Sequence, residues 1–377
     1  MKNCTAFPAN GSKIVLPIVK EADKTTINIS GETFKDLMDK ESVIVIETPS
    51  TSTTLNATDI NLVEFKDEEG SAIALNKITV SIVITSSNKE ESELTTLASK
   101  LGVEKVLPFH SVEVTMKNGD RVVAVEQLNN YMKQQLLVLE ENDAMTISTA
   151  VFIDKKGETN YVPTQISIIN NKYFVTVNSL YLGKEAYFIW NPMQLEQVEN
   201  HWAKVAINDM ASRLVIFEPE KFEPNKAITR ADFAEYLVRA LGIYRQDAIY
   251  ENRFNDVTSS GDRTLAILIA SEYELVSGYS DGTFRPNELI TREEAMTMYQ
   301  KAMKVTKLTG NDINRYQSYI DFGEVSHWAS PFVKEVLAAH VFNGTTATTI
   351  SPKSNLTYAE AAQYIKNLLV ESKIMND

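Results

Sequence analysis

One short motif occurs three times in the second half of the chain, and this repetition constrains the fold more than any other feature. It reads Ile-Thr-Arg-Ala-Asp, then Ile-Thr-Arg-Glu-Glu, then Leu-Thr-Tyr-Ala-Glu, with its threonines at Thr229, Thr291 and Thr357. The spacings between these threonines are therefore 62 and 66 residues. A nearly constant period of this length indicates a repeated supersecondary unit. We expect three copies, with the bounds 196–248, 249–313 and 314–377.

Each copy is expected to hold two helices, of which the second has the clearer pattern. Downstream of each threonine, apolar residues recur with the spacing of the buried face of an amphipathic helix. These sets are Phe233/Tyr236/Leu237/Ala240/Leu241, Ala295/Met298/Tyr299/Ala302/Met303 and Ala361/Tyr364/Ile365/Leu368/Leu369. A weaker helical pattern begins near Trp202, Arg263 and Trp328. Because one short helix pair buries little core, we expect the three copies to pack together as one body.

The first half is rich in β-branched residues, several of which alternate with polar ones as in half-buried strands. Val112–Met116 and Val122–Val125 flank Asn118-Gly119, a dipeptide that favours a hairpin turn. Two short helices are expected, at Glu32–Lys40 and Glu91–Leu101. We therefore predict an α+β multidomain protein, with one or two mainly antiparallel β modules in residues 1–195 and mainly α-helical repeats after them.

The acidic balance of the chain argues against one class of partner. Its formal net charge is −13 at pH 7, and it has no run rich in lysine and arginine. Binding to a phosphate backbone needs a concentrated basic face. We therefore expect no nucleic-acid partner, and any anion must be bound locally by a few placed cations.

Cysteine and histidine usage favours neither a metal nor a cofactor. Cys4 is the only cysteine, which rules out an intrachain disulfide and a cysteine-based metal site. His201 and His327 have no acid or second histidine at ligand spacing, so we interpret them as polar residues at helix starts.

Two targeting signals are missing from the sequence as given. No apolar run reaches the ~18–20 residues that span a bilayer, so we expect no membrane insertion. Residues Met1–Thr5 lack the apolar core of a signal peptide. We expect the chain either to be cytoplasmic or to be a piece of a longer exported protein.

Each copy of the motif also predicts a helix start. Thr-x-x-Asp/Glu before an apolar-periodic run is a capping box, in which the hydroxyl and the acid each accept a backbone N–H of the other residue. Replacing such a cap costs about 1 kcal/mol. We interpret three pairs as structural helix caps, namely Thr229/Asp232, Thr291/Glu294 and Thr357/Glu360.

Capping does not explain Arg230 and Arg292. An arginine at the first helical position opposes the helix macrodipole. Together with free N–H groups of the helix start, its cation favours an anion, above all a carboxylate held in a bidentate fork. The alternative is a surface arginine paired with a neighbouring acid. Trp202 and Trp328, each in a His-Trp-Ala triplet, are either core filler or flat platforms for a sugar ring.

Residues 278–282, Gly-Tyr-Ser-Asp-Gly, have the spacing of a hydrolase nucleophile elbow. An elbow needs a strand before the serine and a helix directly after it, and here the next expected helix begins well downstream. We interpret Gly278 and Gly282 as turn glycines that need positive φ. Tyr279 and Asp281 remain available to face a ligand.

Taken together, these motifs resemble those of S-layer homology repeats. The resemblance covers residues from about 196 to 377, and its segments are His201–Ala203, Ile228–Asp232, Phe254–Val257 and Gly278–Asn287. The first half is similar to the β modules that precede such repeats in bacterial surface proteins, through His110–Val114, Val162–Thr164 and Ile189–Pro192.

The resemblance implies a pseudo-threefold body with ligand grooves between the repeats. It implies non-covalent attachment to a secondary cell wall polysaccharide, often pyruvylated and linked to peptidoglycan, at the cell wall or S-layer surface. Self-association in a surface layer is a further expected interaction. By the family's motifs, Arg230 and Arg292 would meet the ketal carboxylate, and Trp202 and Trp328 would form groove walls. The turn residues carried over are Gly278, Tyr279, Asp281 and Gly282.

Departures from the family pattern reduce the expected number of competent grooves to at most two. Repeat two has Arg263 where the tryptophan belongs, and repeat one has residues 216–220 in place of the glycine-rich turn. Repeat three has Tyr358 in place of the arginine and Thr345–Thr348 in its turn. We expect the groove without the arginine to be the weakest.

Two other readings concern the first half. A glycan-processing enzyme would need a carboxylate pair, for which the candidates are Glu47, Glu64, Glu113, Glu126 and Asp154. Their spacing singles out no two of them, and solvated strand faces explain them equally well. We prefer a non-catalytic role for this half, as a spacer, adhesin or lattice-forming module.

Overall fold

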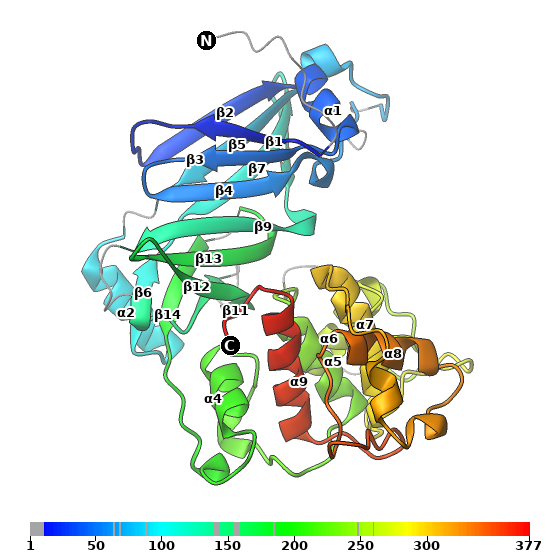
Figure 1. The fold of residues 1–377 in the computed structure, drawn as a ribbon. Coiled ribbons are helices and arrows are strands. Elements are labelled where there is room, and N and C mark those ends of the chain that lie inside the picture. The colour runs from blue at the N-terminus through cyan, green and yellow to red at the C-terminus, as the bar shows by residue number, and fades with distance from the viewer. Residues whose placement is uncertain are drawn as a thin grey trace. The chain divides into compact units, whose positions relative to one another are not determined.

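The computed structural model describes residues 11–62, 65–67, 69–86, 89–138, 144–153, 159–183, 185–246, 249–258 and 260–377. The chain divides into two compact units (Figure 1). The first comprises Met1–Ile153 and Ile166–Ile189, and the second comprises Asp154–Gln165 and Trp190–Asp377. The second unit therefore contains all three copies of the motif and a short segment from the β-rich half.

The first unit is built mainly from strands. Its largest sheet has the order β1-β3-β4-β9-β13-β12, in which β1 and β3 are parallel and the pairs from β3 to β13 are antiparallel. A second sheet, β2-β5-β7-β8, is antiparallel throughout. A third contains β10, β14 and β6, with β10 and β14 antiparallel.

The strand bounds are β1 Lys13–Pro17, β2 Lys24–Ser30, β3 Val43–Glu47, β4 Thr51–Asn56, β5 Thr79–Thr85, β6 Lys105–Pro108, β7 Ser111–Asn118, β8 Arg121–Val125, β9 Gln127–Val138, β10 Thr149–Ile153, β11 Thr159–Val162, β12 Thr164–Ile169, β13 Lys172–Tyr181 and β14 Glu185–Trp190. The parallel β1–β3 pair departs from the antiparallel pattern that the sequence predicts.

The expected hairpin is confirmed by the pairing of β7 with β8, which ends at Asn118 opposite Arg121. Gly119 in its turn has a φ of +58°, a conformation that glycine adopts without strain. The two expected helices are also present, as α1 (Gly31–Asp39) and α2 (Glu91–Leu101). The core of this unit joins apolar side chains of the first two sheets and of α1, including Phe34, Ile44, Ile46, Val80, Ile82, Val112 and Val114.

The second unit is mainly helical, with two longer helices in each copy of the repeat. They are α4 (Lys204–Ser212) and α5 (Arg230–Ala240), α6 (Asp262–Glu272) and α7 (Arg292–Thr306), and α8 (Ser330–Ala338) and α9 (Tyr358–Glu371). The first helix of a copy packs against the second helix of the copy before it, so that α6 contacts α5, α8 contacts α7 and α4 contacts α9. Figure 1 shows the last of these pairs, in which the two ends of the repeat region meet. The three copies therefore form a closed ring.

A cycle of three backbone hydrogen bonds lies where the copies meet. The N–H of Ile228 donates to the carbonyl of Leu356 (2.9 Å), that of Leu356 to Ile290 (2.9 Å), and that of Ile290 to Ile228 (3.2 Å). All three side chains are fully buried. The motif residue before each threonine thus occupies one equivalent position around a pseudo-threefold axis.

A segment of the β-rich half belongs to the helical unit. Strand β11 packs on α5, and the guanidinium of Arg213 in the helical region donates to the carbonyl of Thr164 (3.3 Å). Gly242 has a φ of +68°, and a Cβ at this position would lie 2.6 Å from the ring of Pro163. Glycine is therefore required there, because the turn after α5 touches this segment directly.

These observations confirm the α+β multidomain class, with β-sheets first and a helical pseudo-threefold trio second. Within the described part of the chain, no helix has the length and apolar character needed to cross a bilayer.

Candidate functional site: the junctions between the repeats

The helices α5, α7 and α9 each begin directly after a threonine. Thr229, Thr291 and Thr357 are the N-cap residues, and each hydroxyl accepts the N–H of the third helical residue at 3.2–3.4 Å. In α7 and α9 the acid returns the bond, since the carboxylates of Glu294 and Glu360 each accept the threonine N–H at 2.9 Å. Two complete capping boxes result.

Asp232 departs from this arrangement. Thr229 caps α5, but the reciprocal bond from Asp232 is absent and α5 has no capping box. The carboxylate of Asp232 instead pairs with Nε of Arg263 (2.8 Å) and accepts the hydroxyl of Tyr358. Aspartate is one methylene shorter than glutamate, and its oxygens are directed to partners in repeats two and three.

The N–H groups of the first helical turns are already used. Arg230 N and Ala231 N donate to the carbonyls of Glu288 and Pro286 in the next copy, at 2.9 and 3.0 Å. Equivalent bonds are made at the start of the other two helices. In α7, the N–H groups of Arg292 and Glu293 donate to the carbonyls of Ser354 and Pro352, respectively. In α9, the N–H groups of Tyr358 and Ala359 donate to the carbonyls of Lys226 and Pro224, respectively. The expectation that free N–H groups at these helix starts help to hold an anion is therefore wrong. The threefold closure supplies their partners.

Arg230 lies at the junction between repeats one and two. Its side chain is only 7% exposed, Nε donates to the carbonyl of Phe284 (3.0 Å), and Nη1 pairs with Glu294 (3.3 Å). Its guanidinium also lies over the rings of Tyr279 and Phe284, at 4.9 and 5.0 Å from their centroids. Tyr279 donates its hydroxyl to the same Glu294 oxygen (3.0 Å). The predicted residues Arg230 and Tyr279 are thus brought together on one capping acid.

Arg292 repeats this arrangement one copy later and is buried more completely. Its side chain is 1% exposed, its guanidinium pairs with Glu360, and it donates to the carbonyls of Ile350 (2.6 Å) and Asn343 (3.1 Å). The ring of Phe342 lies 4.7 Å from the guanidinium carbon. Both arginines therefore pair with an acid, as one interpretation of the sequence predicts, but the arginines are buried and the pairs join one copy to the next.

The third junction has different residues in the same places. Tyr358, at the position of the arginines, directs its hydroxyl to Asp232, and burial raises the pKa of this phenol above its ordinary value. Arg263, at the position of the tryptophans, pairs with the same Asp232 and donates to the hydroxyl of Thr229 (3.0 Å). The two departures from the family motif thus meet on one carboxylate. The guanidinium missing at Tyr358 is supplied by Arg263.

A groove of about 380 Å³ opens at this third junction. Its lining includes the aromatic side chains of Phe222, Tyr236 and Tyr358 and the charged side chains of Asp232 and Arg263. Arg263 is 46% exposed, so among Arg230, Arg292 and Arg263 it is the arginine whose cation solvent reaches.

Trp202 and Trp328 are not core filler. They are 63% and 53% exposed, although most large apolar side chains of this unit are buried. Trp202 lies beside the ring of His201, whose Nδ1 accepts the N–H of Ala203 (3.2 Å). His201 thus has the role of a polar residue at a helix start. Among the described residues, no group of three or more potential ligand side chains is placed to hold a metal ion.

The turn at residues 278–282 is a closed loop and has no elbow geometry, because α7 begins only at Arg292. Tyr279 and Thr283 are joined across it by a backbone hydrogen bond of 2.8 Å. Gly282 has the expected positive φ of +80°. The same expectation is wrong for Gly278, which is required for space, since a Cβ there would lie 2.8 Å from both the carbonyl of Thr283 and the ring of Phe254.

Asp281 faces the turn itself. One oxygen accepts the N–H (3.0 Å) and the hydroxyl (2.6 Å) of Thr283, and the other pairs with Arg285 (3.1 Å). The bonds from Thr283 and Arg285 lower the pKa of Asp281 to about 2. Arg285 in turn stacks on the ring of Tyr279, at 3.9 Å from its centroid.

Two acids that sequence reasoning left without a role hold these turns. Asp256 accepts the N–H groups of Phe284 and Arg285, both at 2.7 Å. Asp321 does the same in repeat three for Ile350 and Ser351. Asp256 belongs to the Phe254–Val257 segment that resembles the family motif. Its role in holding the turn was not predictable, because the N–H groups that it accepts lie almost 30 residues downstream.

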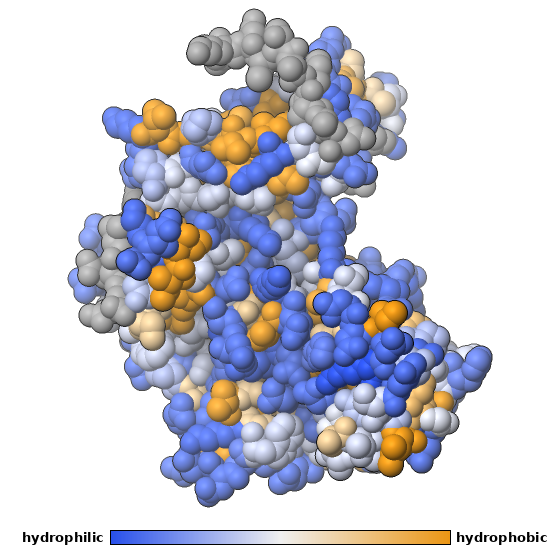
Figure 2. All heavy atoms as spheres, viewed as in Figure 1, coloured by the Kyte–Doolittle hydropathy of each residue, from blue (hydrophilic) through white to orange (hydrophobic). Residues whose placement is uncertain are grey.

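Figure 2 shows how apolar residues are distributed on one face of the molecule. Hydrophilic residues predominate, and hydrophobic residues occur in small separate groups.

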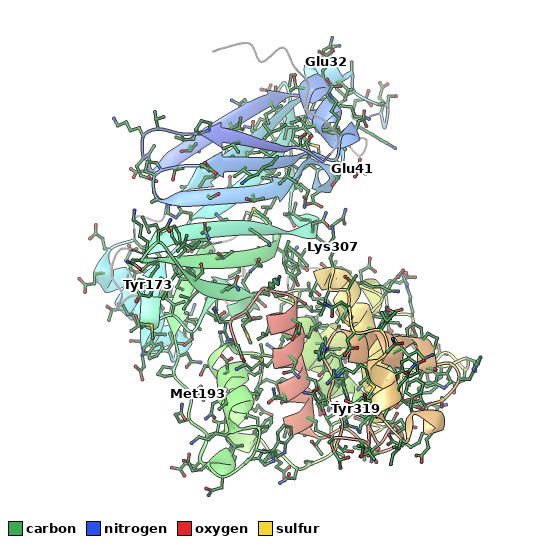
Figure 3. All side chains as sticks on the ribbon, viewed as in Figure 1. Glu32, Glu41, Tyr173, Met193, Lys307 and Tyr319 are labelled. Atoms are coloured by element: carbon green, nitrogen blue, oxygen red, sulfur yellow. The ribbon has the colours of Figure 1, made fainter. Side chains whose placement is uncertain are left out.

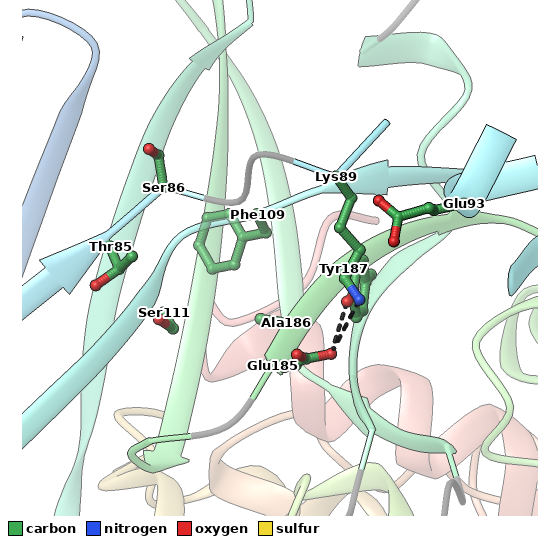
Figure 4. Close-up of a pocket in the computed structure, with 9 residues that line it drawn as sticks. All are labelled: Thr85, Ser86, Lys89, Glu93, Phe109, Ser111, Glu185, Ala186 and Tyr187. Atoms are coloured by element: carbon green, nitrogen blue, oxygen red, sulfur yellow. Dashed lines mark hydrogen bonds and ion pairs between the residues drawn. The ribbon is translucent and has the colours of Figure 1, made fainter. Parts of the chain in front are cut away.

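A cavity of about 280 Å³ with charged side chains in its lining lies in the first unit (Figure 4). Glu185 accepts the hydroxyl of Tyr187 (2.8 Å) and pairs with Lys89 (3.6 Å). Burial, followed by the bond to Glu185, raises the pKa of Tyr187. Glu93 also lines the cavity, but its carboxylate accepts the N–H of Glu90 to cap α2. Both carboxylates are thus already engaged.

Of the carboxylates considered for an enzyme, Glu113 and Glu126 flank the Val114–Val125 pair at the end of the β7–β8 ladder. Glu47 ends β3, Glu113 lies in β7, Glu126 follows β8, and all three are exposed. Glu64 and Asp154 lie outside the described residues.

Comparison with known proteins follows the same division of the chain. The family model of the S-layer homology domain matches residues 198–234, 253–296 and 321–362. The chain therefore carries three S-layer homology domains, which form the closed ring of the second unit. Such domains imply attachment to the cell wall.

Three of the curated proteins to which this chain is similar have names that cover both enzymes and an anchoring protein. An exoglucanase XynX from Acetivibrio thermocellus is 27% identical over 76% of this chain and 24% of its own length. An amylopullulanase from Thermoanaerobacterium thermosulfurigenes is 28% identical over 63% of this chain and 12% of its own length. A cellulosome-anchoring protein from Acetivibrio thermocellus is 30% identical over 39% of this chain and 33% of its own length. The chain thus spans between about an eighth and a third of these relatives' lengths.

Proposed function

We propose that this chain holds a protein at the bacterial cell surface by binding a secondary cell wall polysaccharide non-covalently, through the three S-layer homology domains. The polymer is linked to peptidoglycan and carries pyruvate ketals. The location is the cell wall or S-layer surface, where self-association in a surface layer adds to the attachment.

The exposure of the tryptophans is the observation that carries this proposal. An indole left more than half in water gains little for folding, whereas its flat face and N–H suit a sugar ring. Trp202 and Trp328 occupy equivalent positions in repeats one and three, so one polymer meets two similar platforms.

The buried arginines support the grooves in a different way. Contact of Arg230 and Arg292 with a ketal carboxylate remains a prediction, and it requires their bonds to Glu294 and Glu360 to open. Their present bonds fix the turn of the next copy, which positions Tyr279 beside Arg230. We propose that one groove is shaped by Arg230 together with the turn residues Gly278, Tyr279, Asp281 and Gly282. We propose that Arg292 shapes a second groove in the same way.

Binding to wall fragments tests this function. Purified sacculi are mixed with the protein and sedimented, before and after chemical removal of the wall polymer. The protein is expected to sediment with intact sacculi and to stay in solution with stripped ones. Equal sedimentation with both would contradict the proposal.

We also propose that this chain has no catalytic activity of its own. The relatives named as glycoside hydrolases are much longer than the aligned region, and the family match of this chain is to S-layer homology domains. Turnover of wall glycan by residues 1–195 expressed alone would overturn this part of the proposal.

A further inference from the structure

A second cavity in the helical unit lies within repeat two. It has a volume of about 530 Å³, within the range of small-molecule sites. It is bounded by the residues that follow α6, by Phe254 and by the C-terminal half of α7, whose end is marked by Lys307 in Figure 3. The lining residues all come from repeat two, and among them only Gly278 also belongs to the turn beside Arg230.

Positive charge predominates in this cavity, although the chain as a whole carries a net charge of −13. Arg253, Lys301 and Lys304 line it, against one carboxylate, that of Glu274. The ion pairs of Arg253 are long, at 3.5 Å to Glu251 and 4.0 Å to Glu272.

The two lysines lack the partners that other lysines of this unit have. Within the described residues, Lys301 and Lys304 form no ion pair with a carboxylate, whereas Lys204 and Lys353 pair with glutamates at 2.8 and 2.6 Å. Lys301 donates instead to the hydroxyl of Ser277, at 2.6 Å. The amine is thus fixed at the cavity wall by a neutral group.

Helical spacing adds repulsion between these lysines. Residues three apart on a helix are neighbours, and like charges there destabilise the pair. Burial, and then the charge of Lys304, lowers the pKa of Lys301. An anion placed between the two amines would remove this repulsion and would supply charge-assisted hydrogen bonds.

We propose that this cavity binds an oxyanion carried on a saccharide, with Lys301, Lys304 and Arg253 as its cations and Ser277 as a neutral contact. This inference rests on the proposed function, because the wall polymer is the natural source of such a group. The site gives the chain a polymer contact that is independent of the tryptophans and of the inter-repeat arginines.

Titration of the intact chain with two soluble probes tests the site directly. Inorganic phosphate and glucuronate are added at low salt while the side-chain NMR signals of the lysines are followed. Saturable shifts of Lys301 and Lys304 are expected with at least one probe. Shifts with glucuronate alone identify the bound group as a carboxylate, and shifts with phosphate alone identify it as a phosphate. Either result supports the site.

A charge-matched pair of variants provides the control. Lys301→Met with Lys304→Met is expected to weaken probe binding at least about tenfold, because two charge-assisted hydrogen bonds are lost. Lys100→Met with Lys172→Met removes the same charge from exposed positions of the first unit and is expected to leave binding unchanged. Equal loss in both variants, or no saturable shift of the two lysines, would overturn the proposal.

The two proposals fail in distinguishable ways. If the protein does not sediment with sacculi but the probes still shift Lys301 and Lys304, the anion site stands and the wall function falls. If sedimentation is normal and the probes bind both lysine variants equally, the wall function stands and the site falls.

Discussion

Asp232 shows how a single position departs from its equivalents without breaking the structure around it. Glu294 and Glu360 each cap a helix and bind an arginine from the preceding copy, whereas Asp232 binds Tyr358 and Arg263. The capping threonines were predictable because their partners lie three residues away. The ion pair between Arg263 and Asp232 was not predictable, because Asp232 lies in another copy, 31 residues earlier in the chain.

The arginines are expected to differ sharply in their contribution to stability. Arg292→Ala removes a fully buried guanidinium, leaves the largely buried carboxylate of Glu360 without its cation, and is expected to lower the free energy of unfolding by about 3–5 kcal/mol. Arg263→Ala removes a guanidinium that is 46% exposed and leaves Asp232 its bond from Tyr358, so it is expected to cost no more than about 1 kcal/mol. Urea unfolding of the two variants measures the difference. Equal losses would show that burial does not decide the strength of these pairs.

Asp281 gives a prediction about pH. Its folded pKa of about 2 lies below the unfolded value of about 3.9. A carboxyl with a depressed pKa stabilises the fold above the unfolded value, and this contribution is lost as the pH falls through the folded pKa. Asp281→Asn is therefore expected to be less stable than the parent chain above about pH 4, with the difference vanishing towards pH 2. A stability difference that stays constant or grows on acidification would contradict this assignment.

At the scale of elements, the second helix of each copy was predictable from its apolar spacing and its threonine cap. The packing was not predictable, because each first helix packs on a helix of the preceding copy. The N–H groups of the helix starts illustrate the reason. Their acceptors, such as the carbonyl of Glu288 for Arg230, lie more than 50 residues away and are defined only when the ring closes.

Ring closure makes each copy depend on the others. Removal of residues 314–377 takes away α8 and α9, and with them the packing partners of α7 and α4. The truncated repeat region is expected to lose its cooperative thermal transition, measured by circular dichroism at 222 nm. A transition at an unchanged temperature in the truncated protein would show that the copies fold independently.

At the scale of the whole molecule, a sheet-rich unit is joined to a closed helical trio that belongs to the S-layer homology domains. The sequence predicted both classes of structure, because strands and helices have different apolar periods. The exposure of Trp202 and Trp328 needed the structure, since the same residues fit a core equally well.

Binding of tryptophan variants to intact sacculi tests the central claim most directly. The matched control replaces Ile313 and Ile320, which are 70% and 81% exposed in the same unit. Trp202→Ala with Trp328→Ala is expected to weaken binding at least about tenfold, because truncating an aromatic anchor costs on the order of 2 kcal/mol, and to leave the thermal transition in place. Ile313→Ala with Ile320→Ala is expected to bind like the parent chain. Unchanged affinity of the folded tryptophan variant would contradict the claim that these side chains hold the wall polymer.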